Sequence, residues 1–158
     1  MTTHRVYLSL GSNLGDRAGC LRAAVARLAA LPDTRLAAAS RVIETPPWGK
    51  TDQPAFLNMA VALETALSPE ALLAAARAIE TDLGRRRTEP WGPRTVDIDL
   101  LVYEGETRDT PALRLPHPYL TQRRFVLDPL AEIAPELVIG GKTVREWLAA
   151  LPDDAGMV

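Results

Sequence analysis

Two aspartates separated by a single residue, Asp97 and Asp99, are the clearest candidates for chemistry in this sequence. They lie in the stretch 96–102, whose apolar residues alternate with them as in a strand. Side chains two apart on a strand point to the same side, so both carboxylates project together. Such a pair repels when ionised and favours a cation, and Mg²⁺ completes one or two carboxylates with water and phosphate oxygens. The pair indicates a metal site for phosphoryl transfer; the alternative is a solvated sheet face with two ordinary acids.

Arginines flank this acidic strand. The run 85–87 precedes it, Arg94 lies two residues before it, and Arg123 and Arg124 form a second pair. Guanidinium groups bind phosphate oxygens in a bidentate manner, and phosphoryl transfer requires charge neutralisation around the transferred group. The alternative is a basic surface turn at a helix C-terminus. Neither a G-x-x-x-x-G-K-[ST] phosphate loop nor a G-x-G-x-x-G fingerprint occurs, so any ATP is bound in another way.

Aromatic and imidazole side chains occur in the irregular segments nearby. Trp91, in a Gly- and Pro-containing loop, is either an anchor to the core or a lid residue that stacks on a flat ring. The segment 45–48 is a stiff turn or a rigid wall for a heterocycle. His117, between two prolines, is either a structural histidine or a phosphate contact.

The elements that must position these residues follow the order β-α-β-β-α-β. We expect a strand at 5–10, a helix that starts near Asp16 and ends at Pro32-Asp33, strands at 34–44 and 55–66, a helix from Ser68-Pro69 to a C-cap at Gly84, and a strand at 96–102. This order predicts an α+β, ferredoxin-like core with a mostly antiparallel sheet and both helices on one face.

The rest of the chain, 103–158, is expected to be a C-terminal extension with a short strand pair, a helical stretch near 121–132 and a last helix at 144–150. Strand alternation places Asp97 and Asp99 on the helix-free face of the sheet, together with Tyr7, Ser9 and Asn58. That face is therefore the expected floor of a site.

Composition limits the remaining possibilities. The chain has 158 residues, 47% of them hydrophobic, which fits one domain over 1–158. Its net charge of −2 disfavours a nucleic-acid partner, and no apolar run is long enough to cross a membrane. A single cysteine, Cys20, fits a reducing location. We expect a cytoplasmic monomer.

At Trp91-Gly92-Pro93-Arg94-Thr95-Val96-Asp97-Ile98-Asp99-Leu100-Leu101 the sequence resembles the 6-hydroxymethyl-7,8-dihydropterin pyrophosphokinase family of folate biosynthesis. Further blocks agree in order and spacing, so that the resemblance covers about residues 5–150: Gly11-Ser12-Asn13, Thr45-Pro46-Pro47, Phe56-Leu57-Asn58, Ile79-Glu80, Pro116-His117-Pro118, 123–130 and 133–137.

The resemblance implies a reaction and its partners. ATP would give its β,γ-pyrophosphoryl unit to the hydroxymethyl oxygen of the pterin and leave as AMP. Asp97 and Asp99 would hold two Mg²⁺ ions that arrive with ATP. Arg85, Arg94, Asp97 and Asp99 would form the catalytic set, with Arg85 acting from a loop, 85–95, that closes over the site. Pro118 departs from family members that carry an aromatic or polar residue there, which puts a side-chain contact from this position to ATP in doubt.

The same resemblance assigns two binding sets. The ATP set would be Glu80, Arg87, Trp91, Arg94, His117 and Arg123. The pterin set would be Thr45, Pro46, Trp48, Phe56, Asn58, Trp91, Asp97 and Phe125.

Two other classes of protein can share this fold. A palm-like nucleotidyl transferase also places strand carboxylates on two metal ions, and is the alternative enzyme. The non-enzymatic alternative is an RNA-binding or small-molecule regulatory module. An RNA binder of this fold would display aromatics on the open face, where this chain has acids and Asn58.

Overall fold

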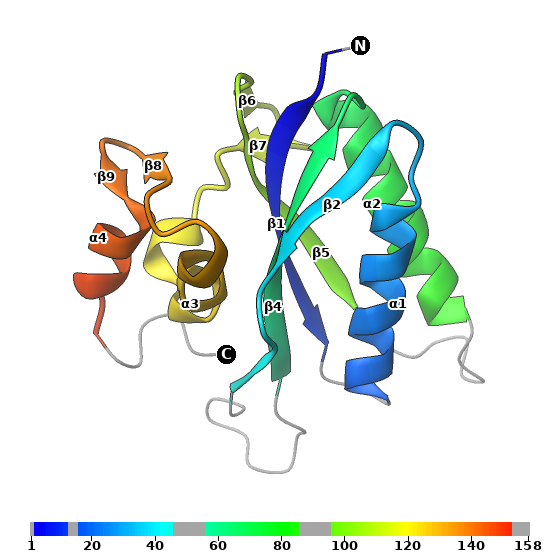
Figure 1. Ribbon diagram of the computed structural model, residues 1–158, viewed down its shortest axis with the longest axis horizontal. Helices are drawn as coiled ribbons and strands as arrows, with labels where there is room; N and C mark the ends of the chain where they lie inside the picture. The colour runs from blue at the N-terminus through cyan, green and yellow to red at the C-terminus, as the bar shows by residue number, and fades with distance from the viewer. Residues whose placement is uncertain (1, 13–15, 46–55, 86–95, 153–158) are drawn as a thin grey trace.

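Helices cover both faces of one antiparallel sheet in the computed structural model, which describes residues 2–12, 16–45, 56–85 and 96–152. The core elements are β1 (His4–Ser12), α1 (Arg17–Ala29), β2 (Thr34–Ala39), β3 (Ile43–Thr45), β4 (Phe56–Thr65), α2 (Pro69–Arg85) and β5 (Asp97–Tyr103). Helices α1 and α2 lie side by side on one face of the sheet (Figure 1). The expected β-α-β-β-α-β core is therefore confirmed.

The C-terminal extension adds β6 (Arg108–Asp109), β7 (Arg114–Leu115), η1 (Leu120–Gln122), α3 (Arg124–Ile133), β8 (Val138–Ile139), β9 (Lys142–Thr143) and α4 (Val144–Ala149). It forms two short strand pairs, β6–β7 and β8–β9, where one was expected. The helical stretch expected near 121–132 is a 3₁₀ turn followed by α3.

The sheet has the strand order β2-β4-β1-β5, and β3 also pairs with β4. The expectation of one strand over 34–44 was wrong, because the chain leaves the ladder after Ala39. There the hydroxyl of Ser40 accepts the Ala60 N–H at 2.9 Å, and Ser40 N–H donates to the Ala60 carbonyl at 2.8 Å. A side chain thus replaces one ladder acceptor, and β3 resumes pairing three residues later.

Local capping explains where the helices begin. Asp16 accepts a hydrogen bond from the Gly19 N–H at 3.0 Å, and Ser68 accepts one from the Ala71 N–H at 3.1 Å, as expected of N-cap residues. The prediction that α2 ends with a C-cap at Gly84 was wrong, because the helix includes Gly84 and runs to Arg85.

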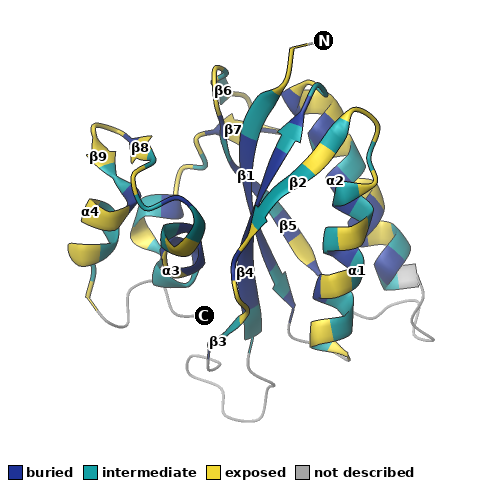
Figure 2. Ribbon diagram, viewed as in Figure 1, coloured by how far each residue is buried: buried dark blue, intermediate teal, exposed yellow. Residues whose placement is uncertain are grey.

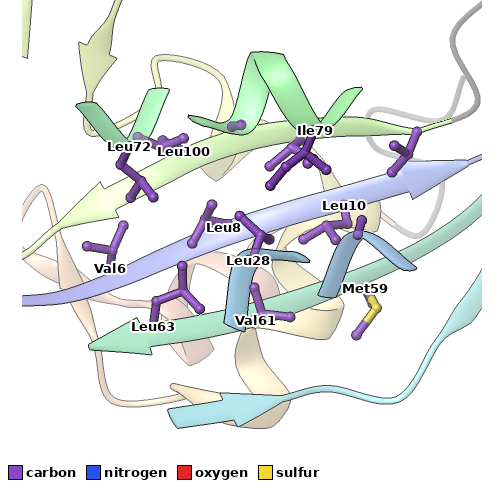
Figure 3. Close-up of a cluster of buried hydrophobic side chains, with 14 of the residues drawn as sticks. Val6, Leu8, Leu10, Leu28, Met59, Val61, Leu63, Leu72, Ile79 and Leu100 are labelled. Carbon is purple, nitrogen blue, oxygen red and sulfur yellow. The ribbon is translucent and has the colours of Figure 1, made fainter. Parts of the chain in front are cut away.

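The main hydrophobic core lies between the sheet and α1 and α2. Figure 3 shows its side chains, among them Leu8, Leu28, Leu63, Leu72 and Leu100. Each fully buried leucine contributes about 1.5–3 kcal/mol relative to an exposed one. This core fixes the side of β5 that faces the helices, and so determines where the alternate residues Asp97 and Asp99 point.

A second core covers part of the opposite face, which was expected to be free of helices. Tyr7, Ala60, Ala62 and Leu101 are buried there against Leu127 and other apolar side chains of α3. Figure 2 shows buried residues of β1 and β4 between the two helical layers. The prediction of an open face was therefore wrong at this end of the sheet, because its residues are apolar and α3 supplies a matching apolar side.

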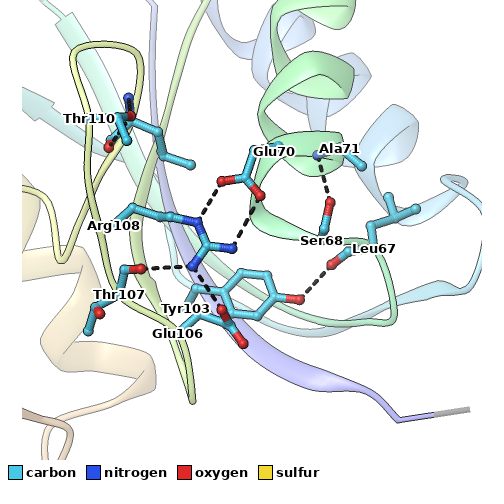
Figure 4. A network of polar contacts seen from close by, with 10 residues as sticks. Leu67, Ser68, Glu70, Ala71, Tyr103, Glu106, Thr107, Arg108 and Thr110 are labelled. Carbon is cyan, nitrogen blue, oxygen red and sulfur yellow. Dashed lines mark hydrogen bonds and ion pairs between the residues drawn. The ribbon is translucent and has the colours of Figure 1, made fainter.

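A polar network joins the start of α2 to the β6 hairpin (Figure 4). Arg108 donates to Glu70 through Nε at 2.6 Å and to Glu106 through Nη1 at 2.8 Å. The Tyr103 hydroxyl donates to the Leu67 carbonyl at 2.5 Å. Within the described ranges, none of the helices is both long and apolar enough to cross a membrane.

Candidate active site

The neighbouring strands β4, β1 and β5 place one row of polar groups on the face of the sheet opposite α1 and α2. This row lies beyond the area that α3 covers. Gly11 of β1 pairs with Asp97 of β5 on one side and with Asn58 of β4 on the other. In the next row Ser9 pairs with Asp99. Asp97 is exposed and Asp99 is partly buried. Gly11, which has no side chain, therefore lies between Asp97 and Asn58 on this face, and we call this row of three residues the Gly11 gap.

The far side of that gap is a buried polar pair. Asn58 Nδ2 donates to the Thr45 hydroxyl at 3.0 Å, and both residues are at least 92% buried. Thr45 pairs with the half-buried Phe56 on β3 and β4. A Cβ added to Gly11 would lie 3.0 Å from Asn58 Oδ1. A flat heterocycle with donors and acceptors on its edge suits this combination of an amide, a hydroxyl and a glycine gap.

The peptide between the two aspartates is held from α2. Ile98 N–H donates to Glu80 Oε2 at 2.7 Å, and Arg77 Nη1 donates to the Ile98 carbonyl at 2.9 Å. Arg77 Nη1 also donates to Glu80 Oε2 at 2.8 Å. Glu80, predicted to contact ATP, is only 1% exposed and uses this oxygen to bind the backbone of β5.

His117 lies on the other side of Asp99. The backbone N–H of His117 donates to the Leu101 carbonyl at 2.8 Å, which attaches this segment to β5. The Tyr119 N–H donates to His117 Nδ1 at 3.2 Å, so the neutral ring carries its proton on Nε2. Burial lowers the pKa of His117, Asp99 raises it, and Arg123 lowers it again. At neutral pH the ring is therefore an uncharged hydrogen-bond donor.

Arg123 and Phe125 flank the start of α3. The Arg123 guanidinium lies 5.3 Å from the Tyr119 ring centroid and 5.9 Å from that of Phe125, within cation–π range. These contacts hold a permanent cation near His117. Arg124, between them in sequence, donates to the carbonyls of Leu148, Leu151 and Pro152 and so ties α3 to the end of α4.

A cavity of about 360 Å³ adjoins Asp99. Its polar lining includes Arg77, Arg114 and His117, and its apolar lining includes Leu73 and Pro118. This volume lies within the range of about 300–1,000 Å³ that small-molecule sites occupy. Cations in a largely polar cleft beside a carboxylate suit a nucleotide whose phosphates approach the aspartates.

The structure links four predicted site residues to Asp97 and Asp99 through described neighbours: Asn58, Thr45, Glu80 and His117. Phe56 pairs with Thr45, and Phe125 contacts Arg123. Others lie outside the described residues: Pro46, Trp48, Arg87, Trp91, Arg94 and most of the loop 85–95. Arg85 is the last residue of α2, and its side chain is likewise outside the described part.

Sequence reasoning missed Gly11, Arg77 and Arg114 as residues of this site. Arg77 had a signal, since it precedes Glu80 by three residues and therefore lies on the same side of α2. Arg114 had none, because a two-residue strand far along the chain carries it to the cavity.

The donor set fits a hard divalent cation. Asp97 and Asp99 offer carboxylate oxygens from one strand, the ligand type that Mg²⁺ prefers. Among the residues that the structure describes, no cluster of three or more His, Cys, Asp and Glu side chains is suited to a metal ion. The described protein groups therefore supply two carboxylates, and the phosphate oxygens of a nucleotide are suited to complete the coordination.

A ferredoxin-like domain with a carboxylate pair beside a cationic cavity is the layout of a metal-dependent group-transfer enzyme. The comparisons with known proteins agree with this class and narrow it. The chain belongs to the 7,8-dihydro-6-hydroxymethylpterin-pyrophosphokinase (HPPK) family, whose model matches residues 7–135.

Relatives match along nearly the whole chain. The sequence is 56% identical over 153 residues to the 2-amino-4-hydroxy-6-hydroxymethyldihydropteridine pyrophosphokinase of Methylorubrum extorquens, covering 97% of this chain and 96% of that one. It is 45% identical over 149 residues to the enzyme of the same name from Pseudomonas aeruginosa, covering 94% and 92%.

Solved structures agree on the fold. The chain superposes on wild-type Plasmodium falciparum HPPK-DHPS with a TM-score of 0.74 at 17% identity. The match covers 94% of this chain and 42% of the other, so this chain spans less than half of that longer protein.

Proposed function

We propose that this chain transfers the β,γ-pyrophosphoryl unit of ATP to the hydroxymethyl oxygen of 6-hydroxymethyl-7,8-dihydropterin. The observation that carries the proposal is the position of Asp97 and Asp99. They lie between the polar gap at Gly11 and Asn58 on one side and the cavity with His117 on the other. Two substrates bound in these places would meet at the carboxylates. The identity of the relatives supports the pterin and ATP as those substrates.

The pterin is assigned to the gap above Gly11. The amide of Asn58 and the hydroxyl of Thr45 would bind the donors and acceptors on the edge of the ring. Phe56 and Phe125 would pack on the ring faces. The family resemblance adds Pro46, Trp48 and Trp91 to this pocket.

ATP is assigned to the cavity beside Asp99. Leu73 and Pro118 would pack against the nucleoside, while Arg114 and the Nε2–H of His117 would bind phosphate oxygens. Arg123 adds a cation held by two aromatic rings. The resemblance adds Arg87, Trp91 and Arg94 to the phosphate contacts, with Arg85 and Arg94 acting in catalysis as the loop 85–95 closes.

The chemistry requires positioning and charge neutralisation more than acid–base catalysis. The hydroxymethyl oxygen bonds to the β-phosphorus, the bond from that phosphorus to the α,β-bridging oxygen breaks, and AMP leaves with that oxygen. The hydroxyl proton passes to solvent or to Asp97, the nearer carboxylate to the pterin gap. Two Mg²⁺ ions held by Asp97 and Asp99 would supply charge neutralisation when bound.

We further propose that residues 1–158 form one domain that acts as a monomer in the cytoplasm, in folate biosynthesis. One cysteine in 158 residues suits a reducing compartment. Size-exclusion chromatography with light scattering tests the monomer, and a stable dimer mass would refute it.

The decisive experiment incubates the protein with ATP and Mg²⁺, with and without 6-hydroxymethyl-7,8-dihydropterin, and separates the products. Pterin-dependent formation of AMP and a pterin pyrophosphate is the expected result. Release of inorganic pyrophosphate with transfer of a nucleotide would instead identify a nucleotidyl transferase. Absence of any pterin-dependent AMP would refute the proposal.

A further inference from the structure

Among the strands that the structure describes, β5 is an edge strand, because the sheet order ends β1-β5. One row of its peptide groups pairs with β1, and the peptide groups of the alternate residues face away from the sheet. An edge strand in this position normally leaves such groups to water or to another chain. At Ile98 both outward groups are instead bonded to side chains of α2.

The hydrogen bonds between Arg77, Glu80 and the Ile98 peptide groups form a closed ring. Glu80 Oε2 accepts from Ile98 N–H at 2.7 Å, Arg77 Nη1 donates to the Ile98 carbonyl at 2.9 Å, and the same two atoms pair at 2.8 Å. Arg77 and Glu80 together thus replace one residue of a missing neighbour strand. Glu80 is 1% exposed, so its charge requires compensation, to which the Arg77 guanidinium and the Ile98 N–H both contribute.

Ile98 is the residue between Asp97 and Asp99. Its side chain is fully buried in the core below the sheet, which anchors the residue from a second direction. With the side chain and both peptide groups of Ile98 fixed, the Cα atoms of the two flanking aspartates have little freedom to change their separation. A metal site formed by both carboxylates would need this backbone spacing to be constant.

We infer that Arg77 is a positioning residue, which acts through Glu80 and the Ile98 peptide to hold Asp97 and Asp99 at the spacing that binds the metal ions. This inference rests on the proposed function. Arg77 also lines the cavity beside Asp99, so its half-exposed guanidinium links the carboxylate pair to the nucleotide site.

The test compares Arg77→Met, which keeps the apolar stem and removes the donors, with Arg77→Lys, which keeps the charge. Arg27→Met is the matched control. Arg27 also forms an ion pair with an acid of α2, Asp82, and its side chain is 41% exposed against 45% for Arg77, but it contacts nothing on β5 in the described contacts.

Two metal-dependent quantities are measured on each variant. One is the Mg²⁺ concentration that gives half-maximal AMP formation at saturating ATP and pterin. The other is binding of Mn²⁺ in the presence of a non-hydrolysable ATP analogue, followed by the electron paramagnetic resonance signal of free Mn²⁺. Pterin affinity without metal and the thermal midpoint are recorded alongside.

Loss of a residue that orients metal ligands typically costs about 10–100-fold in metal affinity or activity, and Arg77→Met is expected to lie in this range by both measurements. Pterin affinity should stay at the wild-type value, Arg77→Lys should recover part of the loss, and Arg27→Met should match wild type. Wild-type metal affinity in a folded Arg77→Met protein would overturn the inference. So would a parallel loss of metal affinity, pterin affinity and thermal midpoint, which marks a merely structural contact.

Arg77→Met removes the Arg77 guanidinium from beside the buried Glu80 carboxylate and so can fail to fold. The double variant Arg77→Met with Glu80→Gln also removes that buried charge and keeps an acceptor for Ile98 N–H. It should fold and still bind Mn²⁺ weakly, and wild-type binding would again overturn the inference. If wild type forms no AMP, the proposed function fails, while the Mn²⁺ measurement still decides the role of Arg77.

Discussion

A Cβ on Gly11 would lie 3.0 Å from Oδ1 of Asn58, a contact that few side chains tolerate. Gly11 sits between Asn58 and Asp97 across three strands, so the missing side chain lets the Asn58 amide pack closely beside the carboxylate pair. The shape of the proposed pterin pocket therefore depends on a residue that has no functional group.

Gly11→Ala should push the Asn58 amide out of line and narrow the gap. Overpacking of this kind costs about 1–3 kcal/mol, which as lost binding free energy corresponds to roughly 5–150-fold weaker pterin affinity. The measurement is a titration with the fluorescent pterin. Gly84→Ala is the control, because a Cβ there meets nothing within 4 Å and the position is helical. Unchanged pterin affinity in Gly11→Ala would contradict the pocket assignment.

Asp97→Asn and Asp99→Asn should each lower AMP formation strongly while the thermal midpoint stays near wild type. Each change removes one anionic ligand from an exposed or half-buried strand position, without altering the core below it. Loss of one key electrostatic group typically costs about 10²–10³ in turnover. Chelation of divalent ions should abolish activity in the same assay, and added Mg²⁺ should restore it.

Glu136→Gln is the control for that pair, because its side chain is 68% exposed and forms its ion pair with Arg145, outside the site. It should retain wild-type turnover. Near-normal activity in either Asp97→Asn or Asp99→Asn would refute the metal assignment.

His117 should make the stability of the protein depend on pH. Burial lowers its pKa below the ordinary value of 6.5, with Asp99 opposing and Arg123 adding to the effect. The unfolded chain therefore takes up a proton at a higher pH than the folded chain does. The free energy of unfolding falls as the pH drops below about 6.5, the unfolded pKa, toward the lower folded pKa. It has its full value above about pH 6.5.

His117→Asn keeps an acceptor for the Tyr119 N–H but has no titrating ring. The difference in unfolding free energy between wild type and this variant should be constant above about pH 7.5 and should shrink as the pH falls to about 5. Urea denaturation across this range provides the measurement. A difference that grows at low pH would mean that the folded state stabilises the protonated ring.

Leu127→Ala should destabilise the protein by about 2–5 kcal/mol, because it empties a fully buried position between α3 and the sheet. Urea denaturation measures the loss. Asp128→Ala, on the exposed side of the same helix, should change stability by no more than about 0.5 kcal/mol. Equal effects of the two changes would show that α3 is not part of the folded core.

The candidate site was predictable where the chain is locally regular. Alternation along 96–102 placed Asp97 and Asp99 on one side of a strand, and the structure confirms that their neighbours Ile98 and Leu100 face the helices. The helix start at Ser68 followed from its hydroxyl and the proline after it. In each case the signal lies within a few residues, where steric and hydrogen-bond preferences act directly.

Other features were not predictable, because they depend on contacts between distant segments. The break after Ala39 requires Ser40 to meet Ala60, and the burial of Tyr7 requires α3 to fold back over the sheet. The cavity that joins Asp99 to Arg114 likewise combines segments that no local pattern relates. A single sequence contains no local pattern that indicates which distant surfaces pack against each other.

By itself, the sequence determined the class of fold, the acidic pair and, through the resemblance, the family. Periodicity and motif spacing carry this information because they reflect the local geometry of strands and helices. Only the tertiary structure decided that α3 covers part of the second face, and that the Asn58 amide packs against Gly11. It alone showed that Glu80 binds the Ile98 peptide, because burial and packing between remote elements set all three relationships.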